Sequence, residues 1–407
     1  MKKVFTVLGL LTLTLLVLAG SGCVTKKEVS PPPLPGQNLT PIIGEAVVEP
    51  QPVKLSDGKY YLMYELKVTN ATPSDYSIEK LTLEDPLNKN KVVAEYGVDD
   101  IKDHFRLPKT DSPTNILKAR ETGLITFCLI LDKNSVPKAI DHVLRIKTGN
   151  PVNILPAETT ERIARTKVDA TAPVVIGPPL KGDNWFAGNV SNNYGHRNAV
   201  FPLNGDWLIP ERWAVDYLKL DNENRICEGD VNNLNNWPGY NQDLLAVSDG
   251  KVLKVVDEFD DLKIGETLAD LNLSNAGGNF VVIDIGGGYS AFYAHLIKGT
   301  ATVKEGDKVK RGRVIGKLGN SGNSTGPHLH FHIIKGTDPI ASQGVPYVVN
   351  KFNVTKQSAT AELPEAFFTG APLEMTTNFT GAHTNEMPAD NTVVNFKKEE
   401  KKEKAAD

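Results

Sequence analysis

A glycine-rich loop followed by alternating histidines restricts the fold of this 407-residue chain more than any other segment. The loop covers residues 319–327 (GNSGNSTGP). Three of the chain's eight histidines follow it and alternate with two apolar residues: His328, Leu329, His330, Phe331 and His332. If this run is a strand, the three histidines share one face and the apolar pair lies on the other. Neutral imidazole binds zinc and titrates near neutral pH, so this face could supply a metal ligand and an acid or base. The alternative is a polar, solvated strand face.

Short strand-like runs also fill the first third of the chain. Segments 60–68, 125–131 and 142–147 alternate apolar and polar residues, and Asn, Pro, Asp and Gly separate them. This pattern, without helical periodicity, predicts a small immunoglobulin-like β-sandwich over residues 42–150. Its sequence predicts no activity beyond that of a spacer or interaction module. We interpret His104 and His142 as structural, because neither has a partner at ligand spacing.

A second β domain follows over residues 191–352, after a proline-rich connector at 151–190. Its strand-like runs are separated by glycine-rich turns, which predicts a mainly β, antiparallel domain. From residue 353 to 407 the chain is polar and ends in KKEEKKEK before its last three residues. We expect a solvated, disordered tail there, with His383 inert.

The N-terminus has the pattern of an export signal. Lys2 and Lys3 precede an apolar run from Val4 to Leu18, and small residues lead to Cys23. The segment resembles the lipobox of bacterial lipoproteins, with Gly20 where that motif usually has leucine. We therefore expect a signal peptide at 1–22, lipidation of Cys23 and a proline-rich tether at 23–41.

An ordinary cleaved signal and an uncleaved membrane span are the alternatives to lipidation. Val24 after the lipobox cysteine resembles outer-membrane sorting in Gram-negative bacteria. The expected location is therefore the cell envelope, lipid-anchored, at the outer membrane facing the periplasm.

Charge and cysteine content exclude some classes of protein. The net charge of −4 includes no basic excess that would indicate a nucleic-acid partner. Beyond Cys23 only Cys128 and Cys227 remain, too few for a disulfide scaffold. We expect each to be a small buried apolar residue.

Two further residues could take part in metal binding or catalysis. Asp216 interrupts the apolar run 213–218, where an ionised carboxylate needs a cation or hydrogen-bond donors. Its partner is either a metal or Arg212, which a strand would place on the same face. His295 ends the apolar run 291–294 and is a candidate acid or base beside the histidines at 328 and 330.

These residues belong to a set of motifs that resembles peptidase family M23, the lysostaphin or LytM family of zinc endopeptidases. The resemblance covers roughly residues 192–347. It rests on four motifs: the A-x-x-x-G-x-V turn at 246–252, Y-x-H-L at 293–296, G-D-x-V-x-x-G-x-x-x-G at 306–316, and G-x-S-x-G-P-H-L-H-F at 322–331. It implies an antiparallel domain like a barrel-sandwich hybrid.

The resemblance also implies roles for individual residues. His330 and Asp216 would bind zinc, and His295 and His328 would be catalytic. The family usually has a histidine four residues before the aspartate, but this chain has Arg212, which has no lone pair for a metal.

His196 is the nearest substitute for that histidine. Residues 211–216 (ERWAVD) are similar to a family variant that pairs an upstream histidine with a Q-R-F-A-x-D strand. The predicted zinc set is therefore His196, Asp216, His330 and one water. His332 either donates a hydrogen bond to a metal-binding residue or is exposed to solvent, and we favour exposure.

The function implied is zinc-dependent hydrolysis of the peptide cross-links of peptidoglycan, with peptide stems as substrate. One alternative is an inactive relative that binds peptidoglycan or activates a cell-wall amidase; the substitution at Arg212 is the reason to consider it. A cell-wall amidase or a divisome protein is the expected protein partner. Another is a lipoyl- or biotinyl-type carrier, which the hairpin at 306–316 resembles but which needs no histidine face.

Two polar insertions, residues 221–243 and 257–275, distinguish the second domain from compact family members. Loops of this length are usually functional or disordered. We expect them to wall a substrate groove, with Trp237 and Tyr240 lining the substrate. The alternative is that these aromatic residues only pack within their loop.

Overall fold

The computed structural model describes residues 39–107, 112–152, 154–190, 194–358, 366 and 368–397. The expected signal peptide, Cys23 and the tether up to residue 38 lie outside this range. Within it, no helix is both long and apolar enough to cross a membrane. The chain is mainly β, as expected, and nearly every strand pairing is antiparallel.

The first domain consists of two sheets around one hydrophobic core. The first sheet has the order β1-β3-β8-β6, with β2 also paired to β3. Its strands are β1 (Ile42–Ala46), β2 (Val53–Lys54), β3 (Tyr60–Asn70), β6 (Phe105–Arg106) and β8 (Thr122–Leu131). The long β3–β8 pairing runs in register from Tyr60 with Leu131 to Thr69 with Thr122.

The second sheet of this domain has the order β10-β9-β4-β5, with β7 paired to β4. Its strands are β4 (Tyr76–Asp85), β5 (Lys91–Tyr96), β7 (Ile116–Leu117), β9 (Ala139–Lys147) and β10 (Glu158–Lys167). Helix α1 (Val98–His104) and a 3-10 turn η1 (Lys133–Ser135) complete the domain. The two sheets form a β-sandwich, and its immunoglobulin-like topology stays a prediction.

Strand β10 corrects the expected connector at 151–190. It pairs with β9 along most of its length, so the first domain extends beyond residue 150. The sequence pattern did not predict this strand because the strand has few apolar residues: Ile163 is its one large aliphatic side chain in the core. An edge strand needs only one buried face, which a mainly polar segment can provide.

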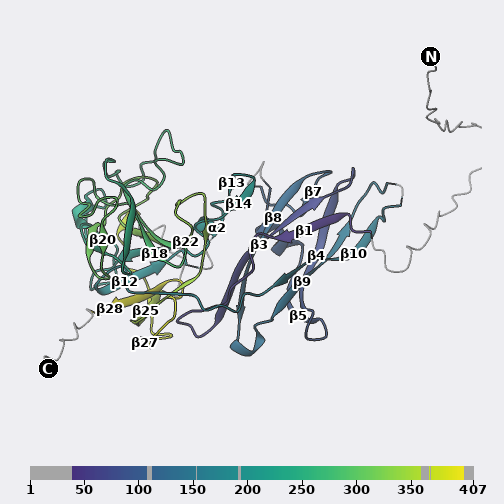
Figure 1. Ribbon diagram of the computed structural model, residues 1–407, viewed down its shortest axis with the longest axis horizontal. Helices are drawn as coiled ribbons and strands as arrows, with labels where there is room; N and C mark the ends of the chain where they lie inside the picture. The colour runs from purple at the N-terminus through teal and green to yellow at the C-terminus, as the bar shows by residue number, and fades with distance from the viewer. Residues whose placement is uncertain are drawn as a thin grey trace, which may run out of the picture. The chain divides into compact units, whose positions relative to one another are not determined.

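The second domain is built on a long sheet of order β20-β17-β18-β19-β22-β15-β12-β28-β25-β26, with β23 on β22 and β27 on β25 (Figure 1). Its strands are β12 (Gly182–Gly188), β15 (Val215–Lys219), β17 (Gly250–Val256), β18 (Phe280–Gly286), β19 (Tyr289–Ala294), β20 (Lys308–Val309), β22 (Leu329–Lys335), β23 (Gln343–Gly344), β25 (Phe352–Ser358), β26 (Met375–Thr376), β27 (Gly381–His383) and β28 (Thr392–Phe396).

Smaller elements surround this sheet. Three two-stranded pairings involve β11 (Val174–Ile176) with β24 (Tyr347–Val349), β13 (Phe201–Leu203) with β14 (Asp206–Leu208), and β16 (Asp243–Leu245) with β21 (Val314–Lys317). Helix α2 (Tyr194–Arg197) and a 3-10 turn η2 (Leu234–Asn236) lie in the connecting segments.

The prediction of a disordered tail from residue 353 is wrong for the described part of that region. Strand β28 pairs with both β12 and β25, so residues 392–396 lie inside the long sheet (Figure 1). The short run TVVNF has three buried apolar side chains, Val393, Val394 and Phe396. The sequence prediction used the average composition of residues 353–407, in which the polar residues around this short strand outweigh its apolar ones. His383 likewise lies in β27, where Nδ1 is 2.8 Å from Glu386 Oε2.

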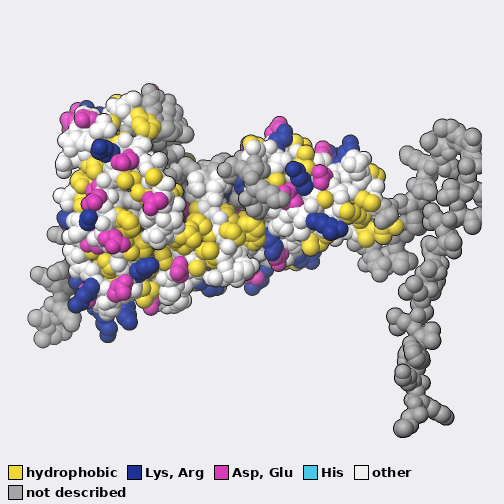
Figure 2. Space-filling model, turned by 90° about the horizontal axis from the view of Figure 1, so that it is seen from above, with side chains coloured by type: hydrophobic (Ala, Val, Ile, Leu, Met, Phe, Trp, Pro, Cys, Tyr) yellow, Lys and Arg dark blue, Asp and Glu magenta, His cyan; other side chains and the backbone are white. Residues whose placement is uncertain are grey.

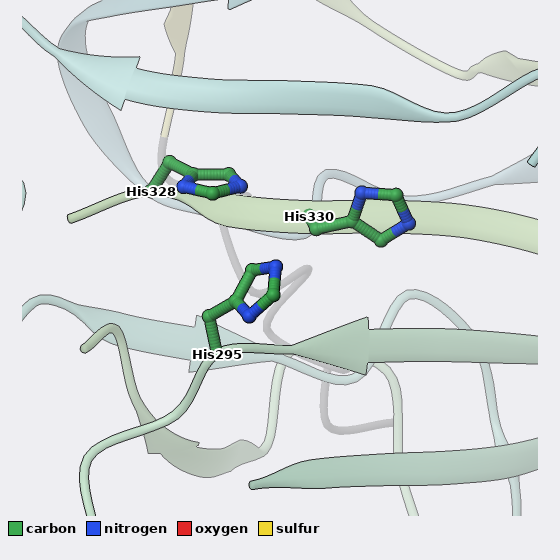
Figure 3. Close-up of side chains that lie close together, drawn as sticks. All are labelled: His295, His328 and His330. Atoms are coloured by element: carbon green, nitrogen blue, oxygen red, sulfur yellow. The ribbon is translucent and has the colours of Figure 1, made fainter. Parts of the chain in front are cut away.

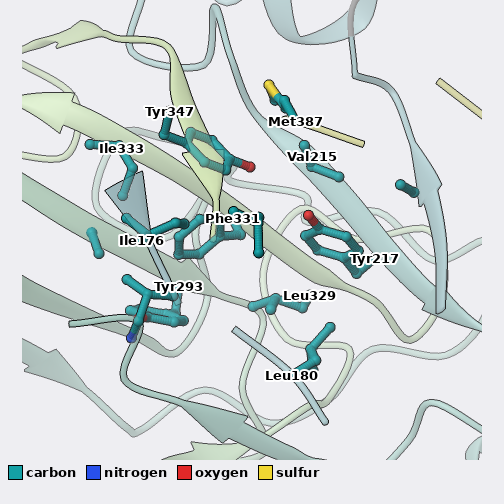
Figure 4. Packing of buried hydrophobic residues seen from close by; sticks show 14 of the residues in the cluster. Ile176, Leu180, Val215, Tyr217, Tyr293, Leu329, Phe331, Ile333, Tyr347 and Met387 are labelled. Atoms are coloured by element: carbon teal, nitrogen blue, oxygen red, sulfur yellow. The ribbon is translucent and has the colours of Figure 1, made fainter. Parts of the chain in front are cut away.

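The apolar faces of the central strands form the main core (Figure 4). Leu329, Phe331 and Ile333 of β22 pack there with Val215 and Tyr217 of β15. Alternation along a strand sends the residues between them to the opposite face. The core therefore orients the histidines of β22 together on the other side of the sheet. On the molecular face in Figure 2, charged side chains of both signs are interspersed, in keeping with the small net charge.

Candidate metal centre

Strand β22 presents the predicted histidine face. The structure confirms the strand and the alternation, with Leu329 and Phe331 in the core and His330 and His332 opposite. β22 lies between β15 and β19. His330 is the Cα partner of Asp216 on β15 and of Ala294 on β19. This register brings the carboxylate to one side of His330 and places His295, the residue after β19, on the other.

Asp216 is the centre of the polar contacts at this site. Its Oδ1 lies 3.0 Å from His330 Nδ1 and 3.5 Å from His328 Nε2. Its Oδ2 lies 3.2 Å from His196 Nε2. The alternative of an Asp216–Arg212 ion pair is not what the structure shows, because Arg212 bonds to Glu65 of the first domain.

His196 lies in helix α2 and is held by the end of strand β12. Its Nδ1 is 3.0 Å from the carbonyl oxygen of Asn189, so Nδ1–H donates and Nε2 faces the carboxylate. One nitrogen from His196, one oxygen from Asp216 and one nitrogen from His330 lie within 4.8 Å of one another. Two imidazoles and a carboxylate are a donor set that suits zinc. The three side chains come from three separate elements, α2, β15 and β22.

His295 and His328 complete a second converging group with His330 (Figure 3). His295 Nδ1 lies 2.7 Å from the carbonyl oxygen of Ser321, and His328 Nδ1 lies 2.8 Å from that of Gly326. In both rings Nδ1–H therefore donates to a carbonyl, which leaves Nε2 as the basic nitrogen. Their ring centroids are 4.7 Å apart.

The backbone of His295 is in the left-handed region, with φ at 66°. This conformation is costly for a residue with a Cβ, and such residues gather at functional sites. Two backbone bonds hold it: His295 N–H donates to Gly277 O, and Gly319 N–H donates to His295 O. The loop at 319–327 thus fixes both the backbone and, through Ser321, the ring of this histidine.

Burial and the shared carboxylate set the charges of the metal-free site. Burial lowers the pKa of His295 well below its ordinary range, and the neighbouring His328 and His330 add to this effect. Burial also lowers the pKa of His328, although Asp216 opposes it. Both rings are therefore neutral and able to accept a proton.

On the side of the site away from His295, Asp216 forms a charged pair with His196. Burial alone would raise the pKa of Asp216, but the protonated His196 holds it well below its usual range. Burial disfavours the protonated form of His196, but Asp216 outweighs it and raises the pKa of His196 to about 9. A metal that binds here would replace the proton on His196 as the partner of the carboxylate.

The favoured prediction that His332 is exposed is wrong. Its side chain is only 1% exposed, and its Nδ1 lies 3.0 Å from His330 Nε2. Its ring packs 4.9 Å from that of Phe292 on β19. The His332 ring is thus buried between the side chains of Phe292 and His330, which share this face of the sheet. Among the described residues, His332 Nε2 has no hydrogen-bond partner.

The two aromatic residues expected to line substrate have different surroundings from those predicted. Trp237 is 2% exposed and packs with Phe186 and Leu218, and its Nε1 donates to Val231 O at 2.9 Å. Its indole cannot line an open groove, so it stabilises the insertion instead. Tyr240 packs against the same cluster, and its hydroxyl donates to Asp261 Oδ2 at 2.7 Å.

Some residues at the site escaped the sequence reasoning. Asn189 Nδ2 donates to Asp216 Oδ2 at 2.7 Å, while its carbonyl accepts from His196. Ser324 Oγ lies 3.2 Å from His328 Nδ1. The only sequence signal for Asn189 is its position after a glycine at a strand end, where asparagine tolerates its φ of 57°.

Comparisons with known proteins identify a family that part of this chain matches. Residues 238–342 match the model of peptidase family M23, a span that contains His295, His328 and His330 but begins after His196 and Asp216. Over 63 residues, 16% of this chain and 14% of the relative, the chain is 49% identical to peptidoglycan DD-endopeptidase ShyA of Vibrio cholerae.

A second relative is glycyl-glycine endopeptidase ALE-1 of Staphylococcus capitis, 38% identical over 87 residues, 21% of this chain and 19% of the relative. The chain therefore spans only a small part of the length of either protein. A solved structure of the catalytic domain of the prophage-encoded M23 protein EnpA from Enterococcus faecalis matches at 25% identity. It has a TM-score of 0.24 and covers 43% of this chain and 92% of that one.

Proposed function

The chain carries a peptidase family M23 domain, and from this we propose that it is a zinc-dependent endopeptidase that hydrolyses the peptide cross-links of peptidoglycan. The observation that carries the proposal is the convergence of His196, Asp216 and His330, with donor atoms within 4.8 Å of one another, beside the neutral rings of His295 and His328. The relatives support the substrate class: one is named for a peptidoglycan DD-peptide bond and the other for a glycyl-glycine bond.

The metal fits the residues present. Both histidine ligands have their second ring nitrogen engaged, His196 Nδ1 by Asn189 O and His330 Nε2 by His332 Nδ1. Such outer contacts orient metal-binding histidines. Zinc held by His196, Asp216 and His330 would act as a Lewis acid that polarises the scissile carbonyl and lowers the pKa of water to about 7.

The chain's own residues would handle the protons of the reaction. A water oxygen attacks the amide carbon, the C–N bond breaks, and one proton must move from the water to the leaving amine. His295 or His328 can accept this proton at Nε2 and return it, since each Nδ1–H is already donated to a carbonyl. The protonated ring can also hydrogen-bond the oxyanion, and each such role is worth roughly a hundredfold or more in rate.

Arg212 was the motive for the inactive alternative, and its position favours the enzyme. The guanidinium lies against Glu65 and away from the donor atoms of the site. A cation in the metal position would have supported a binding module. A module that only binds peptidoglycan would not need three converging metal ligands and two further histidines.

On the sequence of residues 1–24 alone, we also propose that the protein is exported and anchored through lipidated Cys23 in the outer membrane, facing the periplasm. A cell-wall amidase or divisome protein is a proposed partner. Mass spectrometry of the N-terminal peptide tests the anchor: a lipid-modified Cys23 at the mature N-terminus is expected, and a free or absent cysteine would contradict it.

Zinc stoichiometry of the purified chain tests the proposed function. We expect one zinc per chain in the wild type and loss of zinc in His196→Ala and Asp216→Ala. His383→Ala is the control, because its ring contacts Glu386 in the segment between β27 and β28 and does not touch the site. The zinc-loaded wild type should lower the fraction of cross-linked peptide stems in purified peptidoglycan and create new amino termini, and the zinc-free variants should not. A wild type that holds no zinc after dialysis against it would overturn the proposal.

A further inference from the structure

Strand β3 of the sandwich domain contributes side chains to two different cores. Leu62, Tyr64 and Leu66 belong to the core of the sandwich. Tyr61 and Met63 point the other way and belong to the core that contains Leu329 and Phe331 of β22. Strand alternation places Glu65 on this second face, and its side chain is fully buried. The sandwich therefore directs a carboxylate toward the domain that holds the metal site.

Arg212 meets this carboxylate in a two-pronged ion pair. Arg212 Nη2 lies 2.7 Å and Nε 3.0 Å from Glu65 Oε2, and both side chains are 1% exposed. The remaining guanidinium donors reach Gly344 O at 2.9 Å and Gln343 Oε1 at 3.0 Å. A planar guanidinium bound this way has a single orientation, because several bonds must be satisfied at once.

The segment around Arg212 is packed closely enough to transmit that orientation. Gly344 N–H donates to Ile209 O, and a Cβ at Gly344 would lie 2.2 Å from the carbonyl oxygen of Pro210. Ala214 N–H donates to Glu211 O, and β15 begins at the next residue. Only three residues lie between Arg212 and Asp216, and they form this tight turn and the start of the strand.

The sandwich also contacts the segment that supplies His196. Arg106 Nε, at the end of β6, donates to Asn198 Oδ1 at 3.3 Å. Burial raises the pKa of the Cys128 thiol in β8 to about 11, and the nearby Arg197 opposes this rise. His196 and Asp216 are the two candidate ligands that lie before the family match. Each is close in sequence to a residue that contacts the sandwich: Asn198 follows His196, and Arg212 precedes Asp216.

We propose that Glu65 is a positioning residue of the metal site. It holds Arg212, and through Arg212 the segment 209–216, so that the Asp216 carboxylate faces His330. The sandwich domain is thereby a structural part of the zinc site and more than a spacer. This inference rests on the proposed function, since it concerns zinc binding at His196, Asp216 and His330. A buried ion pair is weak evidence for stability, so its value here lies in fixing geometry.

Zinc affinity of three variants of the full chain tests the inference. Glu65→Gln removes the charge, Gln343→Ala removes one bond to Arg212 and keeps the ion pair, and Glu65→Leu with Arg212→Leu replaces the pair by apolar side chains. Apolar replacement of a buried pair is often tolerated, so the double variant can keep its fold where the single variant fails. The control is Asp141→Asn, which breaks the pairs with Arg162 and Arg165 in the sandwich, remote from the metal ligands.

The dissociation constant for zinc is measured by competition with a chromophoric chelator, well below the unfolding temperature of each chain. We expect it to rise roughly 10- to 100-fold in the double variant and in Glu65→Gln, less in Gln343→Ala, and not in the control. Folded variants that bind zinc as tightly as the wild type would overturn the inference. A wild type that binds no zinc would instead contradict the proposed function.

Discussion

Nε2 of His330 lies 3.0 Å from Nδ1 of His332, two residues further along the same strand. In the metal-free site His330 Nδ1–H donates to the Asp216 carboxylate, which can only accept, so Nε2 accepts from His332 Nδ1–H. A metal on His330 Nδ1 would displace the proton there, and the ring would then carry its proton on Nε2 and donate it to His332 Nδ1. Nδ1 of His330 is the atom 3.0 Å from Asp216 Oδ1. His332 therefore holds the ring nitrogen of His330 that points away from the carboxylate, and so orients Nδ1 toward Asp216 and a metal beside it.

Replacing His332 should weaken zinc binding without unfolding the protein. His332→Leu removes the acceptor for His330 Nε2–H, and the zinc dissociation constant is expected to rise roughly 10- to 100-fold. The variant also removes the buried Nε2 of His332, which has no partner among the described residues, so the melting temperature should change little. Chelator competition and a thermal scan measure the two effects. His104→Leu, in the sandwich, should leave zinc affinity unchanged, and an equal affinity in both variants would refute the role of His332.

Asn189 should contribute to the site through its side chain alone. Asn189→Gly keeps the φ of 57° accessible, and so keeps the carbonyl that accepts from His196, but it removes the 2.7 Å bond to Asp216. Zinc affinity should fall roughly 10-fold, as expected for a lost partner of a ligand. A matched control is Asn184→Gly in β12, which also has a positive φ but does not touch the site. If both glycine variants bind zinc equally, Asn189 acts only through its backbone.

Trp237 should matter for stability and not for substrate. Because the indole is buried, Trp237→Ala should lower the free energy of unfolding by about 3–5 kcal/mol. Trp237→Phe keeps most of the packing and loses the bond to Val231 O, which should cost about 1 kcal/mol more than the packing change alone. Denaturant unfolding measures both. A stable Trp237→Phe chain with a raised KM on peptidoglycan peptides would restore the substrate role.

Glu161 should make the sandwich less stable as the pH rises. Burial raises the pKa of this carboxyl to about 8, although Ile42 N–H, 3.1 Å from Oε1, opposes the rise. Between pH 4.5 and 8 the folded chain therefore holds a proton that the unfolded chain has released. The stabilisation is fully present below pH 4.5 and is lost as the pH rises through about 8, with a slope of at most about 1.4 kcal/mol per pH unit.

Urea unfolding between pH 5 and 8 measures this slope. Glu161→Gln should remove most of it, because the amide stays neutral and its oxygen still accepts from Ile42. Glu158→Gln, at an exposed position of the same strand, should leave the slope as in the wild type. A wild-type slope that survives Glu161→Gln would show that another group carries the titration.

Local patterns in the sequence were enough to predict much of the site. The alternation of histidines with Leu329 and Phe331 predicts a strand with one polar and one apolar face, and the structure has both. A carboxylate inside the apolar run of β15 signals a partner, and the structure surrounds Asp216 with three histidines. Both predictions depend on neighbours within a few residues, which a sequence shows directly.

Other features depend on contacts between distant segments, and only the tertiary structure decided them. Strand β28 is inside the sheet because β12 and β25 flank it, and the ring of His332 is buried against Phe292 of the neighbouring strand β19. Arg212 has the same residue type whether it faces Asp216 four residues away or Glu65 in another domain, and the fold selects Glu65. The sequence determined which side chains carry chemistry and which strand faces they share. The long-range packing of the sheets determined their partners, because burial and pairing are properties of the whole fold.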